Sequence, residues 1–382
     1  VAVGVPDWDR AAALGSALGV SEIVAELMIR RGVSDVETGR AYLQAGLEAC
    51  HDPFRIRHMD RAVDLLEEAL AGCQTVFIHG DYDVDGVSAT VLLAEGLRAL
   101  GGEVLYHVPH RITEGYGVSL AAVERAASAG ARLLLTADCG SSSHEAVQRA
   151  GELGMKVVVT DHHRLPPVLP RADAFLNLNH PECTYPDKDL CGTGLAWKLM
   201  AALHQRRGLP CPAEALDLVA LATIADVVPL QGENRVLVRQ GLQALERMDR
   251  PGLSALAAVV GMKPGPLGAW AVALTLAPRL NAAGRIDSAD LAVDLLLERD
   301  PDVCQSRAKE LEVLNTQRQH LEREIREEIG QRLQARADAL QDGVLVEAGA
   351  DWHHGVLGIT AARLVDQWDV PSFVAALEGN LA

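Results

Sequence analysis

Residues 75–100 read TVFIHGDYDVDGVSATVLLAEGLRAL, and this stretch decides the fold. A short apolar run is followed by a polar cluster and then by an amphipathic helical pattern. Further apolar runs recur at intervals of about 25–30 residues, with helical patterns between them: EVLYHVP (103–109), RLLLTADCG (132–140) and KVVVTDHH (156–163). Strands that alternate with helices at this spacing predict an α/β fold with a doubly wound, mostly parallel sheet.

Polar clusters stand at the ends of three of these predicted strands. Ligands of doubly wound sheets bind beyond the carboxyl ends of the strands. In the cluster HGDYDVDG, alternate positions share a face of extended backbone and are occupied by His79, Asp81, Asp83 and Asp85. Carboxylates this close repel one another unless a cation lies among them. The alternative is a solvated turn in which the aspartates cap the following helix.

Two more clusters and one apolar segment add candidate ligands. TADCG supplies Asp138, which taken alone is as easily a helix N-cap. TDHH supplies Asp161, His162 and His163, and two adjacent histidines behind a carboxylate are harder to explain as structural than one. Asp226 stands alone in the apolar segment LVALATIADVVPL, so we expect it to be buried. A buried carboxylate needs a cation or a hydrogen-bond donor, with a buried N-cap as the other interpretation.

The chemistry of these candidate ligands indicates the kind of metal. They are aspartates and histidines without a thiolate, a set that suits Mn²⁺ or Mg²⁺ better than structural zinc. The candidates are too many for one ion, so two cations bridged by shared carboxylates are the economical arrangement. Paired cations are typical of phosphoester hydrolysis. We therefore predict two divalent cations, Mn²⁺ or Mg²⁺.

Composition excludes several classes of protein. The 382 residues are 49% hydrophobic and 23% charged, which suits a globular chain of two or three domains and is too apolar for a disordered one. No uncharged apolar run reaches the roughly 18 residues that span a bilayer, so we expect no membrane contact. The net charge of −17 argues weakly against nonspecific coating of nucleic acid. Seven cysteines without a CxxC pair fit a reducing cytoplasm.

Changes in the sequence pattern indicate the domain organisation. Residues 1–73 are rich in Ala and Leu and predict helices. Residues 74–300 contain the strand and helix alternation, followed by further helices. Residues 301–341 carry apolar side chains at helical spacing and predict one long linker helix of up to about 40 residues, or about 60 Å. Residues 342–382 begin with a strand-like run, GVLVEAG, and predict the start of a second α/β domain.

Taken in order, the motifs resemble those of a known family. HGDYDVDG, TADCG, TDHH and ADVVPL are similar to motifs of the DHH phosphoesterase superfamily. Three later segments resemble the RecJ family of bacterial 5′→3′ exonucleases specific for single-stranded DNA: APRLNAAGRIDSADLAVDLLL (277–297), LNTQRQHLEREI (314–325) and WHHGVLGITAARLV (352–365). The resemblance implies that 74–300 form a catalytic DHH domain on which the first helices pack. It also implies that 342–382 begin a DHHA1 substrate-binding domain, truncated where the family continues.

The resemblance further implies roles for individual residues. Two ions would be held by six side chains: His79, Asp83, Asp85, Asp138, His162 and Asp226. Asp138 and Asp226 would bridge the ions. His163 would act beside the scissile phosphate, Asp161 would fix an imidazole, and Asp81 would be either a ligand or an outer partner. A water between the ions would attack phosphorus in line and release a 5′-mononucleotide.

Basic and aromatic residues of the catalytic region are candidates for substrate contacts. Arg111, Arg279 and Arg285 would bind backbone phosphates, with a surface ion pair as the alternative for each. Tyr116 would stack on a base or else be structural. Asn281 would contact the substrate or fix a loop.

The segments after residue 300 add further candidates. In the part similar to DHHA1, these are His353, Thr360 and Arg363, which would face the metals across a cleft. On the long helix, Asn315 and Arg318 would either face the DNA channel or belong to a packed linker.

The predicted function is hydrolysis of single-stranded DNA from its 5′ end to 5′-mononucleotides, in DNA repair and recombination in the cytoplasm. The expected partners are single-stranded DNA, a single-strand-binding protein and a helicase, with the chain acting as a monomer. The alternative is a phosphodiesterase of short oligonucleotides or cyclic dinucleotides. WHHGVLGI argues against it, because those relatives carry a glycine-rich histidine signature there. A non-enzymatic scaffold is a third interpretation, but such proteins lose metal carboxylates that are all present in this sequence.

Overall fold

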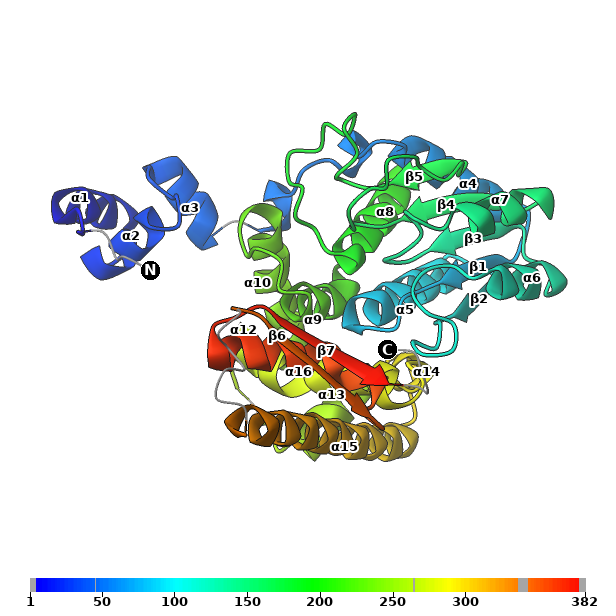
Figure 1. Ribbon diagram of the computed structural model, residues 1–382. Helices are drawn as coiled ribbons and strands as arrows, with labels where there is room; N and C mark the ends of the chain where they lie inside the picture. The colour runs from blue at the N-terminus through cyan, green and yellow to red at the C-terminus, as the bar shows by residue number, and fades with distance from the viewer. Residues whose placement is uncertain (1–4, 45, 264, 336–342, 378–382) are drawn as a thin grey trace.

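A computed structural model of the chain describes residues 5–44, 46–263, 265–335 and 343–377 (Figure 1). Its centre is a five-stranded sheet in the order β2-β1-β3-β4-β5. Every neighbouring pair is parallel, and the strands are β1 (Val76–His79), β2 (Val104–His107), β3 (Leu133–Thr136), β4 (Lys156–Thr160) and β5 (Ala174–Leu176). The predicted doubly wound parallel sheet is confirmed. The direction of winding reverses between β1 and β3, and ligands of such sheets bind at this switch point.

Helices cover both faces of the sheet. One face packs on α4 (Met59–Ala71), α5 (Val84–Ala99) and α8 (Gly192–Arg206), and the other on α6 (Leu120–Ser128) and α7 (His144–Glu152). Because side chains alternate along a strand, β1, β3, β4 and β5 each contribute to both cores. The first core takes Val76, Ile78, Leu133, Leu135 and Val158, and the second takes Phe77, Leu134, Val157 and Val159.

A helical layer continues the first core beyond the sheet. α9 (Leu216–Ala225) packs on α5, on α8 and on α10 (Gly232–Arg247). α11 (Pro251–Val259), α13 (Ala277–Ile286) and α14 (Asp290–Leu297) complete the layer. A short helix, α12 (Ala269–Ala271), and a π-helical turn (Val272–Leu276) lead into α13.

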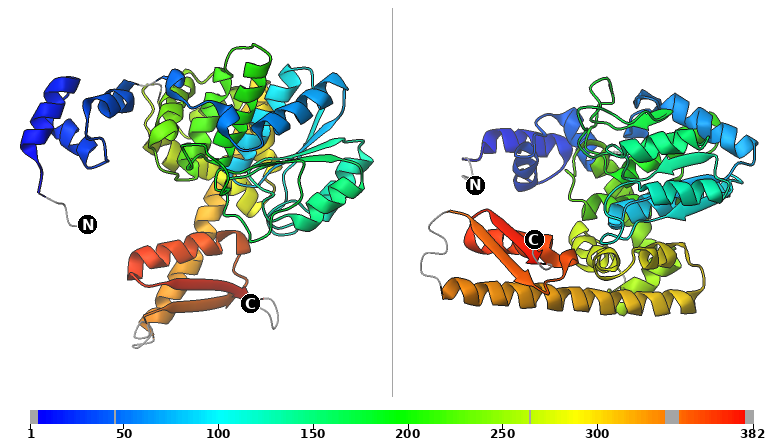
Figure 2. Two further views of the ribbon diagram at one scale, coloured as in Figure 1. Left: turned by 90° about the horizontal axis from the view of Figure 1, so that it is seen from above. Right: turned by 45° about the vertical axis from the view of Figure 1, so that its right-hand side comes forward.

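The predicted linker helix is α15 (Pro301–Gln334), whose 34 residues span about 51 Å. Figure 2 shows it running from the helical layer to a smaller second unit. That unit is a parallel pair, β6 (Leu345–Ala350) and β7 (Ser372–Leu377), with α16 (His354–Trp368) between the strands. The sequence predicts only β6, and the structure adds β7. The end of the predicted helix, residues 336–341, lies outside the described residues.

The N-terminal helices form a small group of their own. α1 (Trp8–Leu18), α2 (Glu22–Ile29) and α3 (Val36–Gln44) pack around a minor apolar cluster and stand to one side of the sheet (Figure 1). Short 3₁₀ turns at Leu47–Ala49 and Pro53–Arg55 lead from them to α4. Within the described ranges, no helix by itself has the length and apolar character to cross a bilayer. Only α1 and α2 taken together do, and they are bent by 109° at their junction.

Candidate metal centre

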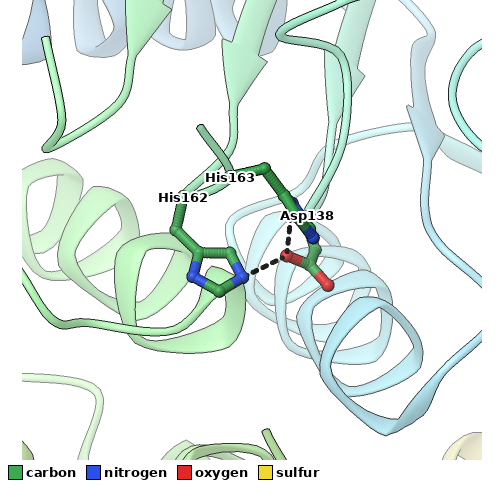
Figure 3. Close-up of side chains that lie close together, drawn as sticks. All are labelled: Asp138, His162 and His163. Atoms are coloured by element: carbon green, nitrogen blue, oxygen red, sulfur yellow. Dashed lines mark ion pairs between the residues drawn. The ribbon is translucent and has the colours of Figure 1, made fainter. Parts of the chain in front are cut away.

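Three loops and one helix end bring the candidate ligands together at the switch point of the sheet. The loop after β1 carries Asp81, the loop after β3 carries Asp138, and the loop after β4 carries His162. Asp226 directly follows the last residue of α9. Figure 3 shows Asp138 facing both histidines that follow β4. The site is therefore assembled from segments that are far apart in the sequence.

Ligand atoms gather there in three groups, and within each group they lie within 4.8 Å of one another. The groups are Asp81, Asp83 and Asp138; Asp85, His162 and Asp226; and Asp138, His162 and His163. Asp138 and His162 each belong to two groups, so the three groups form one continuous cluster. This carboxylate–imidazole cluster has enough donors for two cations with three ligands each.

His162 lies at the centre of the cluster. Its Nε2 atom is 3.1 Å from Oδ1 of Asp138, 3.6 Å from Oδ2 of Asp85 and 3.7 Å from Oδ2 of Asp226. The side-chain amide of Asn179 donates a hydrogen bond of 2.7 Å to the His162 carbonyl. This bond fixes the loop after β4, so the imidazole is held among three carboxylates.

Four buried ligand atoms of this region make no hydrogen bond: Nε2 of His79, Oδ1 of Asp81, Oδ1 of Asp138 and Nε2 of His162. The last two lie 3.1 Å apart as an ion pair without forming a hydrogen bond. An unsatisfied buried polar atom costs about 1–3 kcal/mol, and more when it is charged. Burial lowers the pKa of His79 to about 3, so its imidazole is neutral and keeps the lone pair that a metal ligand needs. A divalent cation would satisfy these carboxylate oxygens and imidazole nitrogens together, and a set dominated by carboxylates suits Mn²⁺ or Mg²⁺. The residues present therefore fit the predicted cations.

Burial and repulsion among the carboxylates raise the pKa values of three of the aspartates. Burial and Asp83 raise the pKa of Asp81 to about 7. Burial and Asp85 raise the pKa of Asp226 to about 6. The pKa of Asp138 lies well above its ordinary value, because of burial first and then because of Asp85 and Asp83. A cation among these groups would favour their charged forms.

The loop after β1 is fixed by its own aspartates. Oδ1 of Asp83 caps α5 by accepting hydrogen bonds of 3.0 and 3.1 Å from the amides of Asp85 and Gly86. The carboxylate of Asp85 accepts bonds of 2.6 and 2.7 Å from the amides of Gly192 and Thr193, in the first turn of α8. Since the cap uses one oxygen of Asp83, the capping alternative and the predicted ligand role are compatible.

The backbone around Asp138 is shaped for close contact with α8. Asp138 has a φ of 65°, a left-handed conformation that Asp tolerates better than most residues. A Cβ atom on Gly192 would lie 2.4 Å from Oδ1 of Asp138. Only glycine at position 192 therefore lets the start of α8 lie directly against the carboxylate.

Asp161 holds His163 in one orientation. Oδ1 of Asp161 accepts the His163 amide at 3.0 Å and lies 2.8 Å from Nδ1 of that ring, while Oδ2 accepts the Ser141 amide at 2.8 Å. Burial opposes the charge of Asp161, but these bonds outweigh it and hold its pKa below the ordinary value. The same hydrogen bond raises the pKa of His163. The Tyr116 hydroxyl lies 3.0 Å from Nδ1 of His163.

Asp226 is less buried than the sequence predicts. Its side chain is 28% exposed, and it ends α9 instead of starting a helix. The next residue, Val227, has a φ of 58° and is 85% exposed, so the chain turns outward directly after the carboxylate. The prediction of burial is wrong because the surrounding apolar run belongs mostly to α9, whose buried part ends at Ile224.

Arg111 and Arg285 lie side by side and also bind the backbone. Arg111 donates to the carbonyl of Gly284 at 3.2 Å, and its guanidinium lies 3.9 Å from the ring centre of Tyr82. Arg285 donates to the carbonyl of Gly355 at 3.3 Å. Burial and then Arg111 lower the pKa of Arg285 to about 10. Two positively charged guanidiniums placed this close together favour an anion between them.

Arg279 and Asn281 have structural partners. Arg279 forms a 2.7 Å ion pair with Glu312 of α15. Asn281 accepts a 3.0 Å hydrogen bond from the amide of Val84, at the start of α5. For Arg279 the contact matches the predicted alternative of an ion pair. For Asn281 it matches the predicted alternative of a residue that fixes the backbone.

A cavity of about 200 Å³ opens beside Asp226, between α9, α13, α15 and α16. Its lining includes Val227, Asn281, Arg285 and Arg318. The guanidiniums of two arginines therefore share a cavity next to one edge of the carboxylate–imidazole cluster.

The remaining candidates differ in how accessible they are. Asn315 is fully buried and accepts a 3.0 Å bond from Arg318, so it positions that arginine and does not face a channel. Nδ1 of His353 caps α16, and Arg363 is exposed. Thr360 is fully buried and donates its hydroxyl to the carbonyl of Val356 at 3.0 Å. Its predicted substrate contact is not supported, because α16 turns this side chain into the packed interior.

Sequence reasoning missed several residues that support the site. Besides the amides that hold Asp85, Asn177 donates to the carbonyl of His163 at 3.0 Å and to Ser141 at 3.1 Å. Glu114 lies 2.9 Å from His107 and accepts the amide of His110, which ties down the loop that carries Tyr116. No local motif marks these residues, because their partners come from other loops.

Comparisons with known proteins agree with this fold. Residues 75–223 match the family described as DHH family, N-terminal domain. The chain is 37% identical over 373 residues to the single-stranded-DNA-specific exonuclease RecJ of Bacillus subtilis (strain 168), covering 98% of this chain and 47% of that protein. A crystal structure of exonuclease RecJ bound to manganese is 39% identical, with a TM-score of 0.76, over 84% of this chain and 80% of its own.

This chain belongs to the RecJ family. A crystal structure of RecJ in complex with Mn²⁺ from Thermus thermophilus matches 98% of this chain and 53% of its own, with 34% identity and a TM-score of 0.85. The chain spans only part of the curated RecJ relatives, 47% of the Bacillus subtilis protein and 64% of the Dickeya dadantii protein. The fold that the motifs imply is confirmed.

Proposed function

We propose that this chain is a metal-dependent exonuclease that degrades single-stranded DNA 5′→3′ to 5′-mononucleotides, in DNA repair and recombination. The observation that carries the proposal is the carboxylate–imidazole cluster at the switch point, whose buried ligand atoms include several that make no hydrogen bond. The names of the RecJ relatives support the choice of single-stranded DNA as substrate. A carboxylate cluster without cations would repel the phosphates of any nucleic acid.

The residues suggest how two cations, Mn²⁺ or Mg²⁺, would be held. Asp81, Asp83 and Asp138 would hold one, and His79, a predicted ligand that belongs to none of the three groups, would add its buried, neutral imidazole. A second group, Asp85, His162 and Asp226, would hold the other. Bound cations supply a water of lowered pKa and stabilise charge on phosphate oxygens. Asp138, which belongs to two groups, is the ligand we propose to be shared, and Asp226 is the second predicted bridge.

His163 is the residue we propose to act on the phosphate or the leaving oxygen. Its raised pKa keeps more of the imidazole protonated near neutral pH, so it can donate a hydrogen bond or a proton. Asp161 fixes the ring through Nδ1, which leaves Nε2 to face the substrate. Positioning of this kind lets the proton move without reorganisation of the site.

The DNA strand would follow the arginines beside the cluster. Arg111, Arg285 and Arg318 offer guanidiniums that bind phosphate oxygens well. Tyr116 is 47% exposed and lies next to His163, so it is placed to stack on a terminal base or to orient the imidazole. His353 and Arg363 would complete the strand contacts from the second unit, while Arg279 and Asn281 hold the helices around the path.

The remaining parts of the proposal concern organisation and partners. We propose residues 74–300 as the catalytic DHH domain, with 1–73 attached to it, 301–341 as the connecting helix and 342–382 as the start of DHHA1. The chain would act as a monomer in the cytoplasm, where its free cysteines stay reduced. A single-strand-binding protein and a helicase would supply its substrate, because duplex DNA must be opened first.

The test is nucleotide release from a 5′-phosphorylated single strand, from the matching duplex and from a dinucleotide. We expect 5′-mononucleotides from the single strand with Mn²⁺ or Mg²⁺, little from the duplex and none in EDTA. A label at the 5′ end should be released before a label at the 3′ end. Release that persists in EDTA would contradict the metal mechanism, and preference for the dinucleotide would favour the small-substrate phosphodiesterase.

A further inference from the structure

A second charged cavity lies between the N-terminal helices and α10. Figure 1 shows α10 beside α3. Its volume is about 330 Å³, near the lower end of the roughly 300–1,000 Å³ typical of small-molecule pockets. Its lining includes Arg31 just after α2, Tyr42 in α3, and Arg235 and Arg239 in α10. None of its lining residues belongs to the carboxylate–imidazole cluster.

The cavity concentrates positive charge in a chain whose net charge is −17. Guanidiniums from two separate segments, Arg31 on one side and Arg235 and Arg239 on the other, line the same space. Burial lowers the pKa of Arg235, and the neighbouring charges of Arg239 and Arg31 lower it further. Cations gathered around one cavity repel one another, and an anion in that cavity would reverse the sign of the interaction.

The carboxylate in the lining does not offset these charges. Glu233 is 2% exposed and forms a 2.6 Å ion pair with the buried Lys198. Its oxygens also accept hydrogen bonds of 2.5 Å from the Tyr185 hydroxyl and from the amide of His51. Glu233 is therefore already neutralised by Lys198 within the core and does not cancel the charge of the arginines in the lining.

Arg235 is held ready for a ligand. Its Nε donates to the carbonyl of Tyr42 at 2.7 Å, and its guanidinium lies 3.5 Å from the ring centre of the same tyrosine. The Nε bond uses one of the five N–H groups of the guanidinium. Fixing the guanidinium plane beforehand lowers the entropy that binding would cost. These contacts also attach α3 to α10, so Arg235 has a structural role that any test must separate from binding.

We propose that this cavity binds a phosphate group through Arg31, Arg235 and Arg239. Arginine suits phosphate because its planar N–H groups match two oxygens at once. The Thr38 hydroxyl and the His51 side chain add polar groups to the lining. A mononucleotide and the backbone of a DNA strand both present such a phosphate. The site is separate from the proposed hydrolysis, and its occupancy does not require the metal centre.

The test is calorimetric titration of the whole chain in EDTA, which keeps the proposed nuclease inactive. The probes are inorganic phosphate, thymidine 5′-monophosphate and a short oligothymidylate. Arg31→Glu is the variant, because Arg31 donates to the carbonyl of Leu27 in its own turn at 3.2 Å and its side chain is exposed. Arg40→Glu is the matched control, since Arg40 is exposed on α3 and does not line the cavity.

We expect at least one probe to bind the wild type, with affinity about tenfold or more weaker for Arg31→Glu and within about twofold for Arg40→Glu. Among the probes whose binding is weakened by Arg31→Glu and not by Arg40→Glu, the one with the highest affinity identifies the source of the phosphate. Absence of binding for all three probes, or equal weakening by both variants, would overturn the proposal. Melting curves check the fold, and Arg31→Gln replaces Arg31→Glu if the latter melts lower.

Discussion

Two buried regions of this chain contain the same kinds of charged side chain and use them in opposite ways. In the core, Glu233 meets Lys198, and Arg250 meets Asp217 and Glu95 at 2.9 and 3.0 Å. At the switch point of the sheet, aspartates lie against other aspartates and against the imidazoles of His162 and His163. The first region pairs its charges within the chain, whereas the three ligand groups of the second contain five aspartates and only two histidines.

The pKa values of charged groups in the two regions show the same contrast. Burial acts to lower the pKa of Arg250, but Asp217 and Glu95 outweigh it, so the pKa lies above the ordinary value and the charged form is favoured. For Asp138, burial and the neighbouring aspartates act in the same direction and oppose the charged form. Burial alone therefore does not mark a functional site; burial without a counter-charge does.

The largest effect that follows from this contrast is on catalysis. Asp138→Asn should lower nucleotide release at least about a thousandfold, or about 4 kcal/mol, because it removes the carboxylate that two groups share. Asparagine tolerates the left-handed backbone at this position, so the fold should survive. Without metal, the free energy of unfolding should stay the same or rise, since one repelling charge is gone. Activity close to that of the wild type would refute the shared role.

The paired region should respond in the opposite sense. Glu233→Ala should lower the free energy of unfolding by about 3 kcal/mol, near the lower end for breaking a buried ion pair. The loss is moderated because Lys198 keeps its 3.0 Å bond to the carbonyl of His51. Urea unfolding measures it, and activity per folded molecule should be retained. Unchanged stability would mean that the two regions do not differ as described.

The sequence predicts the parts of this contrast that are local. Apolar runs at regular spacing predict β1 to β4, and the aspartates and histidines that follow them are found in one cluster. The three-residue strand β5 and the strand β7 carry too little pattern to be recognised. The amides that hold Asp85 come from the start of α8, more than one hundred residues later, so no local motif marks them. Thr360 shows the same limit, since only packing decides that it faces inward.

A smaller effect on nucleotide release tests whether Tyr116 belongs to the carboxylate–imidazole cluster or only lies beside it. Tyr116→Phe removes the hydroxyl that lies 3.0 Å from Nδ1 of His163, while Asp161 continues to hold the ring. We expect nucleotide release to fall about fivefold, or about 1 kcal/mol, with metal affinity unchanged. Leu120→Ala, on the exposed surface of the neighbouring α6, is the control and should have no effect. Weaker metal binding by Tyr116→Phe would show that the tyrosine belongs to the metal centre itself.

The number of Mn²⁺ ions bound per chain, measured by equilibrium dialysis, tests the central claim most directly. Wild type should bind two ions, and Asp138→Asn should bind fewer or bind them much more weakly, while Glu233→Ala should match the wild type. If the folded wild-type chain bound no Mn²⁺ or only one ion, the unpaired carboxylates at the switch point would not be the two-cation site described.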